Sequence, residues 1–91
     1  MKILAVCGTG LGSSFMLEMN IKKVLKELGV EAEVGHTDLG SVTPGLADLF
    51  VMSRDLAGSI NIEGKISLSN IINLAEIKEK LSEEFKNRGI L

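Results

Sequence analysis

Three alternating glycines separate a short apolar segment from a long amphipathic one near the start of the chain. Residues 7–14 read CGTGLGSS, and they follow the apolar residues 3–6. Because glycine has no side chain, such a segment lets several backbone N–H groups turn toward one point, where they can bind an anion. The predicted order is a strand, an anion-binding loop and a helix, which is typical of α/β folds with parallel strands.

The strand signals along the chain are of two kinds. Residues 3–6 and 49–52 are continuous apolar runs, typical of strands buried on both faces. Residues 30–34 and 65–69 alternate apolar with polar side chains, which predicts half-exposed edge strands. Residues 35–45 carry turn-forming side chains with little periodicity, so we expect mostly loop there, with room for a short helical turn.

Two segments have the apolar spacing of amphipathic helices. The first stops at Gly29, and its stripe consists of Leu17, Ile21, Val24, Leu25 and Leu28. The second precedes Gly89, and its stripe consists of Leu74, Ile77, Leu81 and Phe85, with Glu76 and Lys80 paired on the exposed side. Ser13 or Ser14 is expected to cap the first helix, and Ser53 a brief helix over residues 54–60.

Strands that alternate with helices imply right-handed crossovers and a mainly parallel sheet. A chain of 91 residues can bury one core and not two, so we expect residues 1–91 to form a single domain. The expected fold class is α/β: a small open four-stranded parallel sheet in the order 2-1-3-4, with helices on both faces. The loop after the first strand then lies where such sheets bind ligands, like the phosphate loops of flavodoxin and phosphatase folds.

The composition excludes several classes of function. The net charge is -2 and there are three Phe but no Trp or Tyr, so neither a basic surface nor an aromatic platform for nucleic acid is expected. A single cysteine cannot form an internal disulfide. No apolar run approaches the roughly 18 residues of a membrane span, and the N-terminus has no signal-peptide pattern. We therefore expect a soluble, cytoplasmic protein that does not insert into a membrane.

Cys7 opens the glycine-rich loop and is the candidate nucleophile. The N–H groups and the dipole of the following helix would stabilise a thiolate there, together with the oxygens of a phosphoryl group bound to the sulfur. No cluster of His, Cys or acidic residues has the spacing of a metal site. The predicted phosphate-binding residues are Gly8, Thr9, Gly10, Leu11, Gly12, Ser13 and Ser14.

Other interpretations of the loop remain open. Cys7 could be an inert core residue, since cysteine is often buried. A dinucleotide-binding loop would need a glycine where the chain has Ser13. The loop also resembles that of the low-molecular-weight cysteine phosphatases, which have an arginine six positions after the cysteine, again at the place of Ser13. Without this guanidinium the hydrolysis of a phosphocysteine loses electrostatic stabilisation, which favours a carrier over a hydrolase.

The chain as a whole resembles the IIB components of the bacterial phosphoenolpyruvate-dependent sugar phosphotransferase system, of the ascorbate and galactitol type. The resemblance rests on the opening strand, the loop at residues 7–14 and the methionine-rich first helix, with residues 12–16 and Met19 pointing to the ascorbate members. It implies that Cys7 accepts a phosphoryl group from a histidine of a IIA phosphodonor and donates it to a sugar bound by the membrane IIC permease. Residues 8–14 would hold the phosphate, and no cofactor is implied.

A carrier that serves two proteins needs an exposed nucleophile and a surface for docking. Leu11, Phe15 and Met16 are candidates for an outward-facing docking patch, although packing in the core is an equally good explanation of them. We expect His36 to end the second strand. Three roles remain open for it: a base, a pH sensor or a structural residue. Three further polar candidates are expected in loops at the same end of the sheet: Asp38, Thr43 and Arg54.

Overall fold

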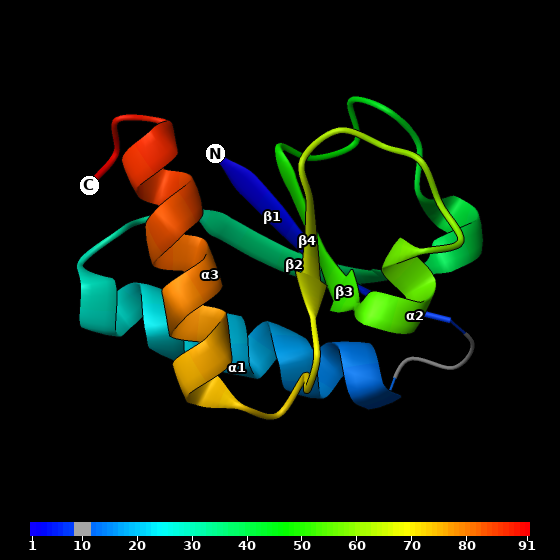
Figure 1. Ribbon diagram of the computed structural model, residues 1–91, viewed down its shortest axis with the longest axis horizontal. Coiled ribbons are helices and arrows are strands. Elements are labelled where there is room, and N and C mark those ends of the chain that lie inside the picture. Colours follow the sequence, from blue (N-terminus) through cyan, green and yellow to red (C-terminus); the bar gives the residue numbers. More distant parts are fainter. Residues whose placement is uncertain (9–11) are drawn as a thin grey trace.

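The computed structural model describes the chain apart from residues 9–11, and it describes residues 12 and 13 by their backbone alone. Strands and helices alternate along the sequence, as Figure 1 shows. The elements are β1 (Lys2–Cys7), α1 (Gly12–Leu28), β2 (Glu33–Asp38), the 3-10 turn η1 (Leu39–Ser41), β3 (Leu49–Ser53), α2 (Arg54–Ala57), β4 (Lys65–Leu68) and α3 (Leu74–Asn87).

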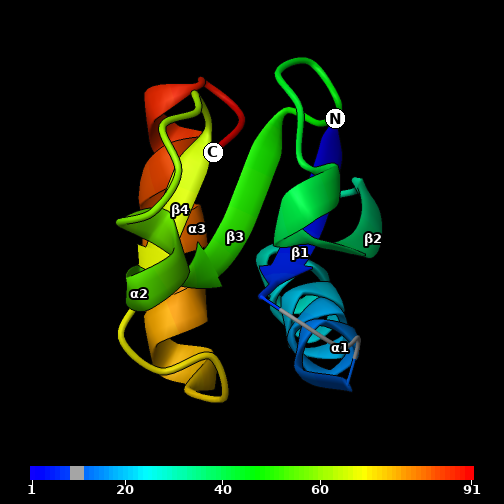
Figure 2. The ribbon, with the colours of Figure 1, turned by 90° about the vertical axis from the view of Figure 1, so that its right-hand side faces the viewer.

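The four strands form one parallel sheet in the order β2-β1-β3-β4, which confirms the predicted topology. The two continuous apolar strands, β1 and β3, lie in the middle, and the two strands with polar side chains form the edges. Helices α1 and α3 cover one face of the sheet, while α2 and η1 lie on the other (Figures 1 and 2). No helix in the described part of the chain is long and apolar enough to span a lipid bilayer.

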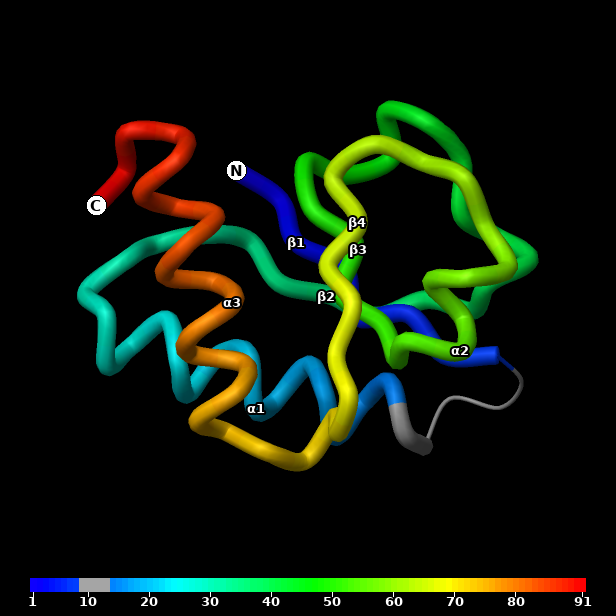
Figure 3. Tube along the Cα trace, viewed as in Figure 1, coloured from blue at the N-terminus to red at the C-terminus, as the bar shows by residue number. Residues whose placement is uncertain are grey.

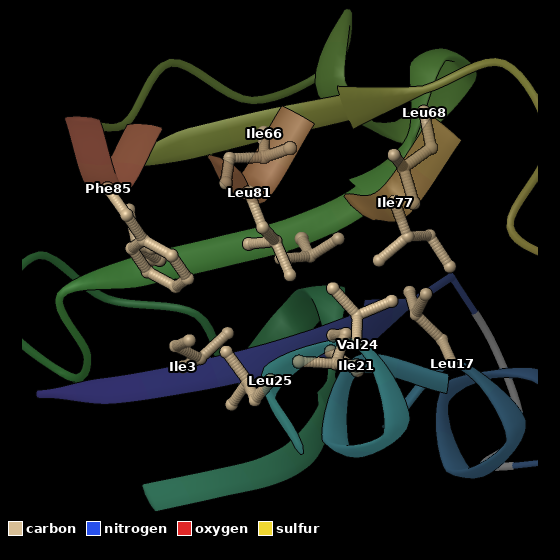
Figure 4. Close-up of a cluster of buried hydrophobic side chains, with 13 residues drawn as sticks. Ile3, Leu17, Ile21, Val24, Leu25, Ile66, Leu68, Ile77, Leu81 and Phe85 are labelled. Atoms are coloured by element: carbon tan, nitrogen blue, oxygen red, sulfur yellow. The ribbon is translucent and has the colours of Figure 1, made fainter. Parts of the chain in front are cut away.

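The larger hydrophobic core fills the space between the sheet and the pair α1 and α3 (Figure 4). Its side chains come from the predicted helix stripes and from one face of each inner strand. They include Ile3, Leu17, Ile21, Val24, Leu25, Ile77, Leu81 and Phe85. A smaller cluster on the opposite face packs Leu4, Val6, Phe50, Met52 and Ala57. The two inner strands are therefore apolar on both faces because both faces are covered.

The prediction for the second strand was wrong in its position. β2 begins at Glu33 and continues through the segment assigned to loop, ending at Asp38. Two causes are visible. Gly29, at φ +71°, ends α1, and the Val30 N–H donates to Leu25 O, so the residues just after the helix serve its C-cap. All six residues of β1 then pair with β2, and this register extends the strand through polar residues.

Several smaller predictions also need correction. α1 begins at Gly12, so Ser13 and Ser14 lie inside its first turn instead of capping it. Ser53 occupies the N-cap position of α2 without a side-chain capping bond, and α2 ends at Ala57. The carboxylate of Glu76, expected to pair with Lys80, is close enough to feel its positive charge, but it accepts hydrogen bonds from the backbone N–H groups of Ser69 and Asn70 at 2.7 and 2.9 Å. Leu74, expected in the core stripe, is 42% exposed.

Candidate functional site

Cys7 is the last residue of β1, at the carboxyl edge of the sheet. It lies opposite Asp38, the last residue of β2, in the register of the two strands. The tube in Figure 3 shows that β1 ends close to α2, which follows β3 at the same edge. Ligands bind at this edge in open parallel sheets, since the loops and helix N-termini that follow the strands gather there.

A pocket of about 340 Å³ reaches Cys7 from the surface. Its lining comes from β1, from the β3–α2 junction and from the loop before α3: Val6, Cys7, Gly8, Ser53, Asp55, Leu56 and Ile71. Cys7 itself is only 4% exposed, so the expectation of a nucleophile exposed at the surface was wrong. A residue in an inner strand of a covered sheet has neighbours on most sides, and the pocket is the opening through which Cys7 can be reached from the surface.

Gly8, which follows Cys7, is exposed and lies against α2. A Cβ atom at Gly8 would lie 3.3 Å from Cδ2 of Leu56, closer than most side-chain contacts. The absence of a side chain at Gly8 therefore lets the chain leave β1 beside Leu56 and keeps the pocket open.

The first turn of α1 supplies the helix N-terminus predicted to face the phosphate. The backbone N–H groups of residues 12–14 belong to the first turn of α1, and the helix dipole adds partial positive charge there. Ser14 is buried, at 1% exposed. Of the other predicted phosphate-binding residues, Gly8 borders the pocket, and Thr9, Gly10 and Leu11 lie outside the described residues.

His36 lies within β2 and not at its end. Its side chain forms a hydrogen bond with a carboxylate on α1. Its Nδ1 atom is hydrogen-bonded to Oε1 of Glu18 on α1, whose other carboxylate oxygen lies 2.9 Å from Nζ of Lys22. The rings of His36 and Phe15 meet edge to face, with centroids 5.8 Å apart. Sequence reasoning missed Glu18, and the only signal was its spacing of four residues from Lys22 on a helix.

The buried position of Glu18 affects its protonation. Desolvation by burial raises its pKa, but hydrogen bonds and positive charge from His36 and Lys22 lower it by more, so the pKa of Glu18 lies below its usual value. The carboxylate is thus held in its charged form at neutral pH.

The remaining polar candidates divide between the two ends of the molecule. Asp38 ends β2 and accepts a hydrogen bond from Oγ of Ser41 at 2.5 Å, and Arg54 begins α2 beside the pocket. Thr43 is not at this edge, contrary to expectation, because it immediately precedes Pro44, which lines a pocket at the amino edge. That pocket is larger, about 650 Å³, but its lining among the described residues includes no cysteine, serine, threonine or histidine, so the pocket at Cys7 is the better candidate for the functional site.

Phe15 and Met16 face outward, at 54% and 52% exposed, as expected of a docking patch. Met19, one turn further along α1, is 48% exposed and extends the same apolar surface. Leu11, the third predicted member, lies outside the described residues. We call Phe15, Met16 and Met19 the α1 patch.

Comparison with known proteins decides the family. Residues 2–83 match the family model described as "PTS system, Lactose/Cellobiose specific IIB subunit". The chain belongs to the IIB family of the sugar phosphotransferase system. Proteins of this kind are phosphotransferases, so the resemblance found in the sequence is confirmed at the level of the family.

Curated relatives extend over nearly the whole IIB chain. An "Ascorbate-specific PTS system EIIB component" of Mycoplasma pneumoniae is 34% identical and covers 89% of this chain and 90% of its own. Proteins with the same description from Salmonella typhimurium and Escherichia coli O157:H7 are 31% identical over 93% of this chain and 89% of theirs.

Comparison with a solved structure also confirms the fold. The solution structure of a low molecular weight protein tyrosine phosphatase from Bacillus subtilis superposes with a TM-score of 0.59, covering 96% of this chain and 98% of the phosphatase. The two sequences are only 14% identical, so this likeness concerns the fold alone.

Proposed function

We propose that this IIB protein is a phosphoryl carrier in which Cys7 forms a phosphocysteine. The thiol sulfur attacks the phosphorus of a phosphohistidine on the IIA partner, so the S–P bond forms while the P–N bond breaks, and the proton lost by the thiol passes to the leaving imidazole. A hydroxyl oxygen of the sugar bound by the IIC permease then attacks the same phosphorus. The sulfur leaves as a thiolate, and the hydroxyl proton passes to water.

One observation carries this proposal: the single cysteine of a IIB chain ends β1, an inner strand, and lines a pocket at the carboxyl edge. The backbone N–H groups of residues 8–14 would hold the phosphoryl oxygens, assisted by the dipole of α1. Helix N-termini bind phosphate in this way without a metal ion. The site residues proposed are therefore Cys7 as nucleophile and residues 8–14 as phosphate ligands.

A hydrolase is the alternative that the phosphatase-like fold raises. Position 13, where the phosphatases to which the loop is similar carry an arginine, is Ser13 here. A bidentate guanidinium stabilises the charge that develops on the transferring phosphoryl group, and serine cannot replace it. A phosphocysteine would consequently persist long enough to be passed to an acceptor.

We propose ascorbate as the sugar that is finally phosphorylated. The relatives at 31–34% identity are described as ascorbate-specific and cover about nine-tenths of this chain. The description of the family model names lactose and cellobiose, so these two sugars are the alternatives to ascorbate. Sugar uptake assays with the cognate IIC permease, comparing ascorbate with lactose and cellobiose, test this choice.

The partners proposed are a IIA phosphodonor and a membrane IIC permease, with residues 1–91 acting as a single cytoplasmic domain. We place the docking of the IIA donor on the α1 patch because it is exposed and begins in the first helical turn after the phosphate loop. Methionine side chains adapt to different surfaces, which suits a patch that must contact a second partner later.

Phosphorylation of the intact protein tests the proposal directly. Incubation with the general phosphotransferase proteins, a cognate IIA and phosphoenolpyruvate should add about 80 Da, the mass of one phosphoryl group. Cys7→Ala should gain no mass, whereas Ser59→Ala, a change at an exposed serine that does not line the pocket, should be phosphorylated. An unchanged mass of the wild-type protein would refute the carrier function.

A further inference from the structure

The contact between Glu18 and His36 joins α1 to the edge strand β2. Oε1 of Glu18 accepts the hydrogen bond of His36 Nδ1, and Oε2 lies 2.9 Å from Nζ of Lys22, so both carboxylate oxygens are engaged. The side chain of Glu18 is 11% exposed and that of His36 is 31% exposed. A hydrogen bond to an ionised carboxylate that is shielded from water is stronger than an exposed ion pair and is weakly screened by salt.

Both residues lie close to the proposed phosphate site along rigid elements. Glu18 follows Ser14 by four residues, which is one turn of α1 and a rise of about 6 Å. His36 pairs with Ala5, two residues before Cys7 on β1. The hydrogen bond therefore connects the helix whose first turn would bind the phosphate to the strand that lies beside the nucleophile's own strand.

We propose that Glu18 and His36 are positioning residues for phosphoryl transfer. Their hydrogen bond fixes α1 along its axis, and so fixes the N–H groups of residues 12–14 relative to the sulfur of Cys7. The inference rests on the proposed function of Cys7. Errors of about 1 Å in the placement of groups around a reacting centre reduce rates on the order of 100-fold, so a loosened helix would slow transfer markedly.

The ring of Phe15 adds a second link to the same contact. It meets the His36 ring edge to face, although more than half of Phe15 is exposed. Loss of His36 therefore frees a member of the α1 patch as well as Glu18, whereas loss of Glu18 leaves the two rings in contact. The two positions are separable by experiment for this reason.

Single-turnover transfer from phosphorylated IIA to the full-length protein tests the proposal. Glu18→Ala should lower the maximal rate constant about tenfold or more and change the half-saturating donor concentration less than about twofold. Glu18→Gln, whose amide oxygen still accepts from His36, should restore most of the rate, and so should His36→Asn, whose amide nitrogen lies close to the place of Nδ1. Glu84→Ala removes an ion pair of 2.7 Å with Arg88 at the far end of α3 and should transfer at the wild-type rate.

Hydrogen exchange of backbone amides gives a second measurement that does not need transfer. Glu18→Ala and His36→Ala should both speed exchange at residues 16–19, whose N–H groups bond to the carbonyls of the first turn of α1, and leave the middle of α3 unchanged. Thermal unfolding verifies that each variant is folded. Wild-type rates and wild-type exchange in both alanine variants would overturn the proposal, as would an equal loss of rate in Glu18→Gln and Glu18→Ala.

The two proposals can fail separately. If the wild-type protein accepts no phosphoryl group, the carrier function of Cys7 fails, and the exchange data alone decide whether Glu18 and His36 hold the first turn. If the wild-type protein is phosphorylated and the alanine variants match it in rate and exchange, only the positioning role fails.

Discussion

Gly8 and Leu56 approach each other so closely that a side chain on Gly8 would contact Cδ2 of Leu56 at 3.3 Å. Both residues line the pocket that leads to Cys7. A side chain at position 8 would therefore push against Leu56 and narrow the pocket, and a larger side chain would do so more.

Substitution of Gly8 should act on stability and on access to Cys7. Gly8→Ala is expected to be tolerated, because the end of the Leu56 side chain can move by a few tenths of an ångström. Gly8→Val should destabilise the fold by about 1–3 kcal/mol through crowding and slow the alkylation of Cys7 by iodoacetamide. The double variant Gly8→Val with Leu56→Ala should recover part of both losses. Unchanged alkylation in Gly8→Val would contradict this view of the pocket.

The two ends of the predicted α3 stripe should differ strongly in their contribution to stability. Phe85 is fully buried, so Phe85→Ala should lower the free energy of unfolding by about 3–5 kcal/mol. Leu74 is 42% exposed, and Leu74→Ala should change this free energy by about 0.5 kcal/mol or less. Urea unfolding followed by circular dichroism measures both, and equal losses would show that the stripe is buried along its whole length.

Glu18 should make stability depend on pH below neutrality. Because burial is outweighed by the hydrogen bonds from His36 and Lys22, its pKa in the folded state lies below the value of 4.5 expected when the chain is unfolded. The carboxylate therefore stabilises the fold above pH 4.5, and this contribution is lost as the pH falls through the lowered pKa. The free energy of unfolding of the wild-type protein relative to Glu18→Gln should decrease between pH 5 and pH 3. A difference that stays constant over that interval would be evidence against a lowered pKa.

The α1 patch should determine the affinity for the IIA donor. Phe15→Ser and Met16→Ser should each raise the half-saturating concentration of phosphorylated IIA about fivefold or more, with little change in stability, since both side chains are largely exposed. Ile90→Ser, at an exposed apolar residue beyond α3, provides the control. If Ile90→Ser weakens the donor interaction as much as the patch variants, the docking surface lies elsewhere.

Local sequence patterns were enough to predict the strands and helices whose side chains are buried in the core. The runs at residues 3–6 and 49–52 are apolar because both faces of the inner strands are covered, so they identify β1 and β3 and the order of the sheet. The stripe that includes Ile77, Leu81 and Phe85 identifies α3 in the same way. These patterns are reliable because buried apolar residues recur in them at the fixed spacing of a strand or a helix.

The position of β2 and the contacts of the site depended on residues that are far apart in the sequence. His36 belongs to a strand because β1 offers six residues to pair with, and not because of its own β-propensity. Glu18 contacts His36, and Leu56 and Ile71 line the same pocket as Cys7, only after the crossovers bring α1, α2 and the loop before α3 to one edge of the sheet. The sequence by itself determined the candidate nucleophile, the glycine-rich turn and the strand order, all of which follow from short-range periodicity and backbone freedom. Tertiary structure alone decided that Cys7 is buried beneath a pocket and that Glu18 is paired, because burial and pairing depend on which distant segments pack together.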